Sequence, residues 1–443
     1  MLGFLTRLIS SIISRKEKEQ IVVQLGKYTT DIDFAKNGKL SEALTFYRQE
    51  RYGLAYKSVL EYLMTVSFNG VVLTEKEDGK IGFIIYQGSK QVEGEVSDDM
   101  VIAHADVVRY SGELKLELME MLLKENYFLR YGRFVLLPDR ISLKFDSKSK
   151  CLTPYDFYNA LREIALTADR YDDILIESYN GLEPINIQHI IELSPEQKKA
   201  KVDFFKLWIR QYLTVVDRLT KDKFGKEHNK GLVSYILLSL IYKLYYLIAP
   251  EGVLLDELKQ MDSLFWEGHE DVIIKNEILY NRLMVLYKMN NEQLSKWFYN
   301  VRSTFSMVKA VEPEKIKSFI EAELESLKWM RLDKYYSQYY IYGLEYILGY
   351  LCFHIAMKPV YIELVNIVWR AMNDKFFLAL GYHVSYRTLK DKLNSFTIEN
   401  AINQVLGKYN IKTFRSSKID YTSDANFMRS FLVELVNMLE YEK

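Results

Sequence analysis

The pattern of apolar and polar residues along the chain changes character near residue 185. Before this point, short apolar runs alternate with Gly and Asp-Gly breaks, a pattern that predicts strands between helices. After "EPINIQHIIELSPEQ", in which Ser194-Pro195-Glu196 has the composition of a helix start, apolar residues recur with the 3.6-residue period of a helix. The sequence therefore predicts an α+β N-terminal domain followed by a mostly α-helical C-terminal domain.

The first part has the predicted order α-β-β-β-α-β-β-α. Asp78-Gly79 has the chemistry of a tight hairpin turn between two of these strands, which favours an antiparallel sheet. The predicted elements are a helix at about 41–63, two strands within 70–88, a third strand near 100–108, a helix at 113–125, a hairpin within 126–149, and a long helix from Thr153 to about Ser178.

The stretch "NYFLRYGRFVLLPDRISLKFDSKS", residues 126–149, predicts a half-buried hairpin whose turn is Leu137-Pro138-Asp139-Arg140. The alternation indicates one buried side on each strand. The expected buried residues are Phe128, Phe134 and Leu136 on the first strand, and Ile141, Leu143 and Phe145 on the second.

The same stretch raises the alternative of a metal-dependent nuclease site, which needs an aspartate and an acidic-x-Lys pair on adjacent strands. Here Asp139 falls in the turn, and Asp146-Ser147-Lys148 is expected beyond the far end of the second strand. At about 3.3 Å per residue, the two groups lie roughly 20 Å apart. The spacing therefore disfavours a nuclease.

The predicted helix 113–125 has two apolar stripes and an apolar arc much wider than the roughly 100° that a surface helix needs. One stripe suits the sheet, and the other must meet the helical domain, a second copy of the chain or another protein. The stripes are Leu114, Leu118, Met121 and Leu122, and Leu116, Met119 and Leu123. The candidate protein-interaction residues are Leu114, Leu116, Leu118, Met119, Leu122 and Leu123.

The predicted domain organisation has four parts. They are a leading amphipathic helix and linker (1–40), the α+β domain (41–182), a linker (183–195) and an α-helical bundle domain (196–443).

The leading residues "MLGFLTRLISSIISRKEKEQ" place apolar side chains at helical spacing ahead of a charged run. Arg7 interrupts the apolar stretch and the basic residues follow it, whereas a signal peptide has its positive charge first. We expect this helix to dock on protein. The alternative is an interfacial membrane anchor formed by residues 1–15.

Two further apolar stretches, 232–249 and 339–358, approach the length of a membrane span. Lys243 lies within the first, and Glu345 and His354 lie within the second. We expect both to be buried helices of a bundle, because neither has flanking charges that would set a membrane orientation.

Composition narrows the function classes. Lys+Arg and Asp+Glu both number 59, so no overall charge attracts the chain to nucleic acid, and no nucleic-acid partner is expected. The two cysteines, Cys151 and Cys352, have no spacing for a disulfide framework or zinc site and fit a reducing compartment. The expected localisation is cytoplasmic, with membrane-surface contact through residues 1–15 as the peripheral alternative.

Motifs of known chemistry are missing from the sequence. The six histidines are dispersed, and no HExxH, GxxxxGK[ST], GxGxxG or GxSxG motif occurs. We therefore predict no catalytic residues, metal or cofactor, and an enzyme of unrecognised chemistry is the alternative. All five tryptophans lie in the helical part, where core packing or a recognition surface would use them.

Three segments carry a resemblance: "AYKSVLEYLMTVSFNGVVLTEKEDGKIGFIIYQG", "ELKLELMEMLLKENYFLRYGRFVLLPDRISLKF" and "LTPYDFYNALREIALTADRYDDIL". Over about residues 50–180 the chain resembles type III secretion chaperones and the related YbjN-type proteins. The resemblance implies a non-enzymatic domain that pairs through its second helix and holds an extended, poorly folded client segment. We expect a chaperone-like or adaptor module within a multi-protein assembly such as a secretion or defence apparatus, whose partners are other proteins or a second copy.

Overall fold

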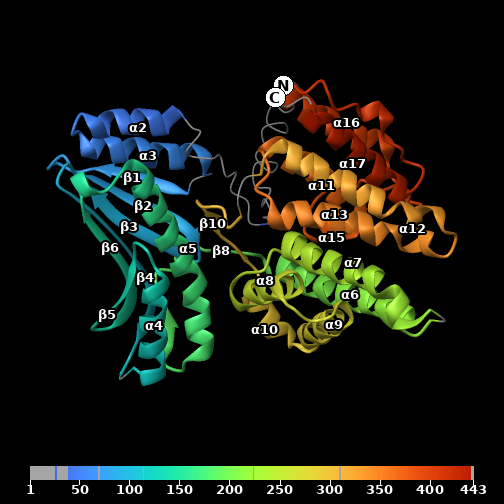
Figure 1. Ribbon diagram of the computed structural model, residues 1–443, viewed down its shortest axis with the longest axis horizontal. Coiled ribbons are helices and arrows are strands. Elements are labelled where there is room, and N and C mark those ends of the chain that lie inside the picture. The colour runs from blue at the N-terminus through green and yellow to red at the C-terminus, as the bar shows by residue number, and fades with distance from the viewer. Residues whose placement is uncertain are drawn as a thin grey trace, which may run out of the picture.

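The computed structural model describes residues 25–26, 38–67, 70–112, 114–222, 224–308 and 311–440. The predicted leading helix lies outside these residues. The fold class is confirmed: an N-terminal antiparallel sheet with flanking helices precedes a mostly helical C-terminal region (Figure 1).

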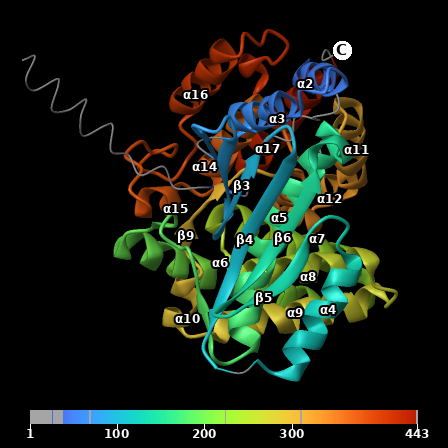
Figure 2. The ribbon, with the colours of Figure 1, turned by 90° about the vertical axis from the view of Figure 1, so that its left-hand side faces the viewer.

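The helix predicted at 41–63 is divided into α2 (Gly38–Arg48) and α3 (Tyr52–Val66). Glu50, between them, has a φ of 61°, a left-handed conformation that an α-helix does not continue through. The division lets both helices cover one end of the sheet (Figure 2).

The sheet contains a strand that the sequence analysis missed. The path of hydrogen-bonded strands is β1-β2-β3-β4-β6-β5, and every pairing is antiparallel. The missed strand, β3, buries Val92 and Val96, but its charged residues obscure the apolar alternation. The strands are β1 (Val71–Glu75), β2 (Ile81–Gly88), β3 (Lys90–Val96), β4 (Met100–Tyr110), β5 (Arg133–Leu137) and β6 (Arg140–Lys148).

One face of the sheet is covered by α5 (Pro154–Ser178), which begins at the predicted residue Thr153, whose side chain accepts from the Asp156 amide. Phe157, Leu161 and Ile164 on this helix are fully buried in the N-terminal core. In Figure 2 the opposite face of the sheet is turned to the viewer, in front of α5.

The predicted hairpin is present, with its turn at Pro138-Asp139 between β5 and β6. Three details of its prediction are wrong, one of them the burial of Leu136, which lies near the end of β5 and is 46% exposed. Phe128 ends the preceding helix instead of entering the first strand, and Asp146-Ser147-Lys148 lies within β6 instead of beyond it. Ile141, Leu143 and Phe145 are buried as expected.

The hairpin geometry keeps the nuclease-type residues apart. Asp139 lies in the turn, and Lys148 is the last residue of β6, at the other end of that strand. The structure therefore does not bring these groups together.

The helical domain begins with α6 (Pro195–Thr220), capped by Ser194 and Gln197 in a reciprocal capping box, as the Ser-Pro-Glu start predicts. The remaining elements of both domains complete the fold. In the first domain these are α4 (Leu116–Phe128) and the 3₁₀ turn η2 (Ser149–Cys151). The helices of the helical domain are α7 (Gly225–Lys243), its π-helical continuation η3 (Leu244–Ile248), α8 (Gly252–Glu267), α9 (Val272–Lys288), α10 (Asn291–Lys296), α11 (Pro313–Ser326), α12 (Lys328–Leu332), α13 (Tyr340–His354), α14 (Pro359–Met372), α15 (Asp374–Ala379), α16 (Ser395–Lys408) and α17 (Asp424–Glu440), with the 3₁₀ turns η4 (Tyr336–Tyr339) and η5 (Ser416–Lys418). The short strands are β7 (Leu182–Pro184), β8 (Ile191–Glu192), β9 (Tyr299–Asn300) and β10 (Arg302–Ser303).

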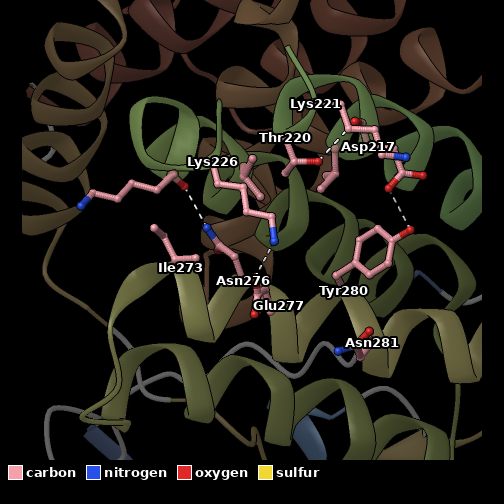
Figure 3. Close-up of a pocket in the computed structure, with 12 residues that line it drawn as sticks. Asp217, Thr220, Lys221, Lys226, Ile273, Asn276, Glu277, Tyr280 and Asn281 are labelled. Atoms are coloured by element: carbon pink, nitrogen blue, oxygen red, sulfur yellow. Dashed lines mark hydrogen bonds and ion pairs between the residues drawn. The ribbon is translucent and has the colours of Figure 1, made fainter. Parts of the chain in front are cut away.

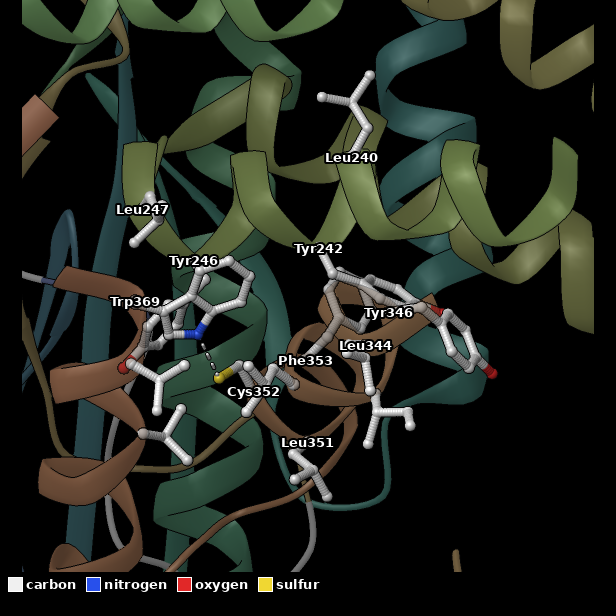
Figure 4. Packing of buried hydrophobic residues seen from close by; sticks show 14 of the residues in the cluster. Leu240, Tyr242, Tyr246, Leu247, Leu344, Tyr346, Leu351, Cys352, Phe353 and Trp369 are labelled. Atoms are coloured by element: carbon white, nitrogen blue, oxygen red, sulfur yellow. Dashed lines mark hydrogen bonds between the residues drawn. The ribbon is translucent and has the colours of Figure 1, made fainter. Parts of the chain in front are cut away.

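The two apolar stretches predicted as bundle helices form α7 with η3, and α13, and they pack against each other in the core of the helical domain (Figure 4). Lys243 of one helix lies 3.0 Å from Glu345 of the other, and the Tyr212 hydroxyl donates to the same carboxylate. The charges inside these apolar helices are therefore paired with each other.

Among the described residues, one helix, Gly225–Ile248, is long and apolar enough to cross a membrane by length and composition. Of its apolar window, 89% is buried inside the protein, which is typical of a core helix.

The two parts of the chain are joined through a segment of the helical half that reaches the sheet. β10 pairs with β2, and the Thr304 hydroxyl bonds to the carbonyl oxygens of Gly70 and Tyr86. Phe305 is buried in the N-terminal core. This exchange across the junction was not evident in the sequence.

Candidate interaction site

The helix α4 has two faces with different environments. Leu118 and Leu122 are buried in the N-terminal core, and Leu114 and Met121 are half-buried against it. This stripe therefore faces the sheet. Because Leu118 and Leu122 are covered by their own domain, they are not accessible to a partner in this structure.

The other stripe of α4 faces outward. Leu116 is 65% exposed, Leu123 is 68% exposed, and Met119 is half-buried. The alternative in which the helical domain covers this stripe does not hold for Leu116 and Leu123, because both are exposed and that domain packs against α5 through α8. The predicted interaction role of the stripe stays a prediction.

Two aromatic residues that the sequence analysis did not include extend the outward stripe. Tyr127 is 84% exposed and Phe128 is 67% exposed, and their rings meet edge to face at 5.4 Å between centroids. Helical spacing places Tyr127 four residues after Leu123, on the same side of the helix. That signal was lost because the strand was expected to begin before Phe128. The exposed face of α4 consists of Leu116, Met119, Leu123, Tyr127 and Phe128.

The edge of the sheet lies next to this face. Asn126 clamps β5, since its side-chain amide donates to the Phe134 carbonyl oxygen at 3.1 Å and its carbonyl oxygen accepts from the Phe134 amide at 2.6 Å. Leu136, two residues further along the strand, directs its N–H and C=O to the same edge. No bond to these two groups occurs within the part of the chain described, and the Leu136 side chain is itself exposed.

The loop between α4 and β5 is fixed by α5. The Glu163 carboxylate accepts from the backbone amides of Arg130, Tyr131 and Gly132 at 2.8–2.9 Å. The Tyr131 hydroxyl donates to Asp156 at 2.8 Å. The helix and the strand edge are therefore held in one orientation, which lowers the entropy cost of binding at this site.

A second group of polar residues lies at the junction of the two domains. Lys90, with no solvent exposure, donates to the carbonyl oxygens of Val107 and Ile185 at 2.9 and 3.1 Å, and lies 3.1 Å from Asp172. Ser89 donates its hydroxyl to the same aspartate. Burial raises the pKa of Asp172 above its ordinary value, while the Lys90 ammonium opposes this shift.

Asp173, the next residue of α5, contacts the start of α8. Burial, with the neighbouring carboxylates Asp172 and Asp169, raises the pKa of Asp173 to about 8. A Cβ atom on Gly252 would lie 2.6 Å from an Asp173 carboxylate oxygen, so the helical domain approaches this group closely. These contacts attach α5 to the helical domain.

Hollows occur on the helical domain and at the junction. A cavity of about 340 Å³ between α6, α7 and α9 has apolar side chains in its walls and polar ones that bond to one another: Tyr280 donates to Asp217, and Lys226 donates to Glu277 (Figure 3). A larger cavity, about 560 Å³, lies between α5 and α8. In the described ranges, no group of three His, Cys, Asp or Glu side chains has the arrangement to hold a metal ion.

In comparisons with known proteins, no family model and no curated protein matches this chain. The resemblance to type III secretion chaperones and YbjN-type proteins therefore stays a prediction from the sequence.

Proposed function

We propose that this chain is a non-enzymatic protein-interaction module, chaperone-like or adaptor in kind, that works within a multi-protein assembly such as a secretion or defence apparatus. Its proposed binding surface is the exposed face of α4 together with the edge of β5 at Leu136. The observation that carries the proposal is the 65% and 68% exposure of Leu116 and Leu123, side chains that a folded domain ordinarily buries.

The energetic case rests on the apolar area that this face leaves in water. Burying one leucine side chain stabilises a complex by roughly 1.5–3 kcal/mol before the costs of association are subtracted. Tyr127 and Phe128 add aromatic side chains, which are favoured at protein interfaces because each gives a large contact area. A partner that covers all of these side chains would gain enough to bind specifically.

The proposed occupant is an extended apolar segment of a partner protein. Leu136 offers an outward N–H and C=O beside an exposed apolar side chain, and an added β-strand satisfies both backbone groups while its side chains meet the apolar face. The Asn126 clamp occupies the adjacent backbone positions at Phe134, so the added strand would begin beyond that residue.

The test is affinity capture with the full-length chain. Leu116→Glu combined with Leu123→Lys should abolish recovery of a stoichiometric protein partner, because both changes place charge on the contact. The matched control is Leu389→Glu, at a fully exposed leucine on the helical domain, which should leave recovery unchanged. Equal recovery by both variants would refute the proposed surface.

Light scattering separates a client from a second copy. If the wild-type chain has twice the monomer mass and the double variant has the monomer mass, a second copy occupies the face instead of a client segment. Circular dichroism of the double variant should match the wild type, since neither substituted side chain is buried.

A further inference from the structure

The outer end of the helical domain carries a cluster of aromatic rings contributed by two separate segments. The Tyr336 ring centroid lies 6.1 Å from that of Phe224 and 5.0 Å from that of Trp329. Tyr335 meets Phe224 at 5.5 Å. Phe224 precedes α7 and Trp329 belongs to α12, so the cluster joins two turns that are distant in sequence (Figure 1).

Hydrogen bonds hold this cluster in place. Asp222 accepts from the backbone amides of Phe224 and Gly225 at 2.8 and 2.9 Å, and from the Tyr335 hydroxyl at 2.7 Å. Gly225 has a φ of 71°, which a residue with a side chain adopts only with strain. The Tyr336 hydroxyl donates to Asn229 of α7. The end of the domain is therefore a fixed surface.

Apolar side chains point into solvent from this fixed surface. Leu332 is 70% exposed, Trp329 is 48% exposed and Phe224 is 38% exposed. Trp329 and Leu332 are three residues apart on α12, which places them side by side, while Met330 between them is buried in the core. The helix thus uses one residue to attach to the domain and presents the other two outward.

Basic side chains surround the apolar ones. Those exposed on the same two segments are Lys221, Lys328, Arg331 and Lys334. Three carboxylates are nearby, and they are already engaged: Glu325 lies 3.0 Å from Lys328, Asp333 accepts from the amides of Tyr335 and Tyr336, and Asp222 holds the turn. These carboxylates keep their charges, so the four basic and three acidic side chains together carry one net positive charge (four minus three), although the whole chain has no net charge.

We propose that this end of the helical domain, defined by Phe224, Trp329 and Leu332 with its basic rim, docks on the surface of an anionic lipid membrane. Trp is favoured at the level of the lipid headgroups because its amphipathic ring keeps its polar N–H in water, and Phe and Leu insert toward the acyl chains. Lys and Arg extend to the phosphate groups and are attracted by anionic lipid.

The shape of this end favours a membrane over a protein groove as the partner. In Figure 1, α12 and the turn between α6 and α7 form the end of the molecule farthest from the sheet. Phe224 lies on that turn, Trp329 and Leu332 lie on α12, and all three are exposed, so they are available to a planar interface at this end. This surface is separate from α4, and its proposed role is independent of the proposed function.

The test is co-sedimentation of the full-length chain with phosphatidylcholine vesicles that contain or lack phosphatidylserine. The wild type should sediment with the anionic vesicles, less so as salt is added, and weakly with the neutral ones. Trp329→Glu combined with Leu332→Glu should weaken this binding at least about tenfold, since it removes both apolar contacts and adds like charge to the lipid.

The matched control is Leu389→Glu combined with Phe396→Glu, at two strongly exposed apolar residues elsewhere on the helical domain. All variants keep residues 1–15, so any binding by that segment is common to every sample. Binding that is lost only in the Trp329 and Leu332 variant supports the proposal. Equal binding by both double variants, no sedimentation of the wild type, or equal binding to neutral vesicles would each overturn it. An unchanged melting temperature excludes misfolding as the cause of the loss.

Discussion

Replacing Lys90 with Met should be among the most destabilising single substitutions in the N-terminal domain. The ammonium is fully buried and has three acceptors: the carbonyl oxygens of Val107 and Ile185, and the Asp172 carboxylate. Met has a similar length and no charge, so the change removes these interactions with little change in volume. Asp172 would then stay buried without its counter-charge.

Lys90→Met should lower the free energy of unfolding by about 3–5 kcal/mol, the usual cost of removing one member of a buried ion pair. Two carbonyl oxygens left without a donor are consistent with this range, since each unsatisfied buried group costs roughly 1–3 kcal/mol. Removing both charges together, in Lys90→Met with Asp172→Leu, should be less damaging than Lys90→Met alone, because no uncompensated charge remains.

The assay is urea unfolding followed by two probes. The five tryptophans all lie in the helical part, so their fluorescence reports on that domain, while far-ultraviolet circular dichroism reports on both. The loss of unfolding free energy in Lys90→Met should become smaller as pH is lowered, because Asp172 then takes up a proton and its buried charge disappears. A loss below about 1 kcal/mol, or a double variant as unstable as the single one, would refute this reasoning.

Three further predictions, with five substitutions, test other parts of the structure. With a pKa raised to about 8, Asp173 keeps its proton in the folded state, whereas in the unfolded chain the carboxyl loses it near its ordinary pKa. The stability of the fold should therefore fall as pH rises between about 4 and 8. Asp173→Asn should flatten this part of a plot of melting temperature against pH, and an unchanged slope would contradict the assignment. Leu118→Ala should lower the free energy of unfolding in urea by about 2–5 kcal/mol, whereas Leu116→Ala should change it by no more than about 0.5 kcal/mol, because only the Leu118 side chain is buried. Equal losses would mean that both stripes of α4 are covered in solution. Asp139→Ala and Lys148→Ala should each preserve biological activity, and loss of activity in a folded variant would restore the nuclease hypothesis.

Features that depend on neighbouring residues were predictable from the sequence. The Pro138-Asp139 turn, the Thr153 and Ser194 helix starts and the long helix α5 all appear where the pattern placed them. Turn and cap chemistry acts over three or four residues, so it can be recognised without knowing what the element packs against. The change from a sheet to a helical bundle follows from apolar periodicity in the same way.

Features that depend on distant contacts were decided by the tertiary structure. The sequence predicted two stripes on α4 but did not indicate which of them meets the sheet, since both have the same composition. The strand β3 has an acidic, weakly apolar pattern, and it is a strand because it lies between β2 and β4. Contacts between strands, unlike caps, are made by residues that can be far apart in sequence.

The junction gives the clearest case of this difference. Lys90, Asp172 and Ile185 each look like ordinary residues of a strand, a helix and a linker, and the fold brings the Lys90 ammonium within hydrogen-bonding distance of the other two. The same is true of Phe224 and Trp329, more than one hundred residues apart, whose rings share contact with Tyr336. Local chemistry therefore determined most of the elements, but not β3. Burial and charge at each face depend on which elements meet, and that is set by the packing of the whole chain.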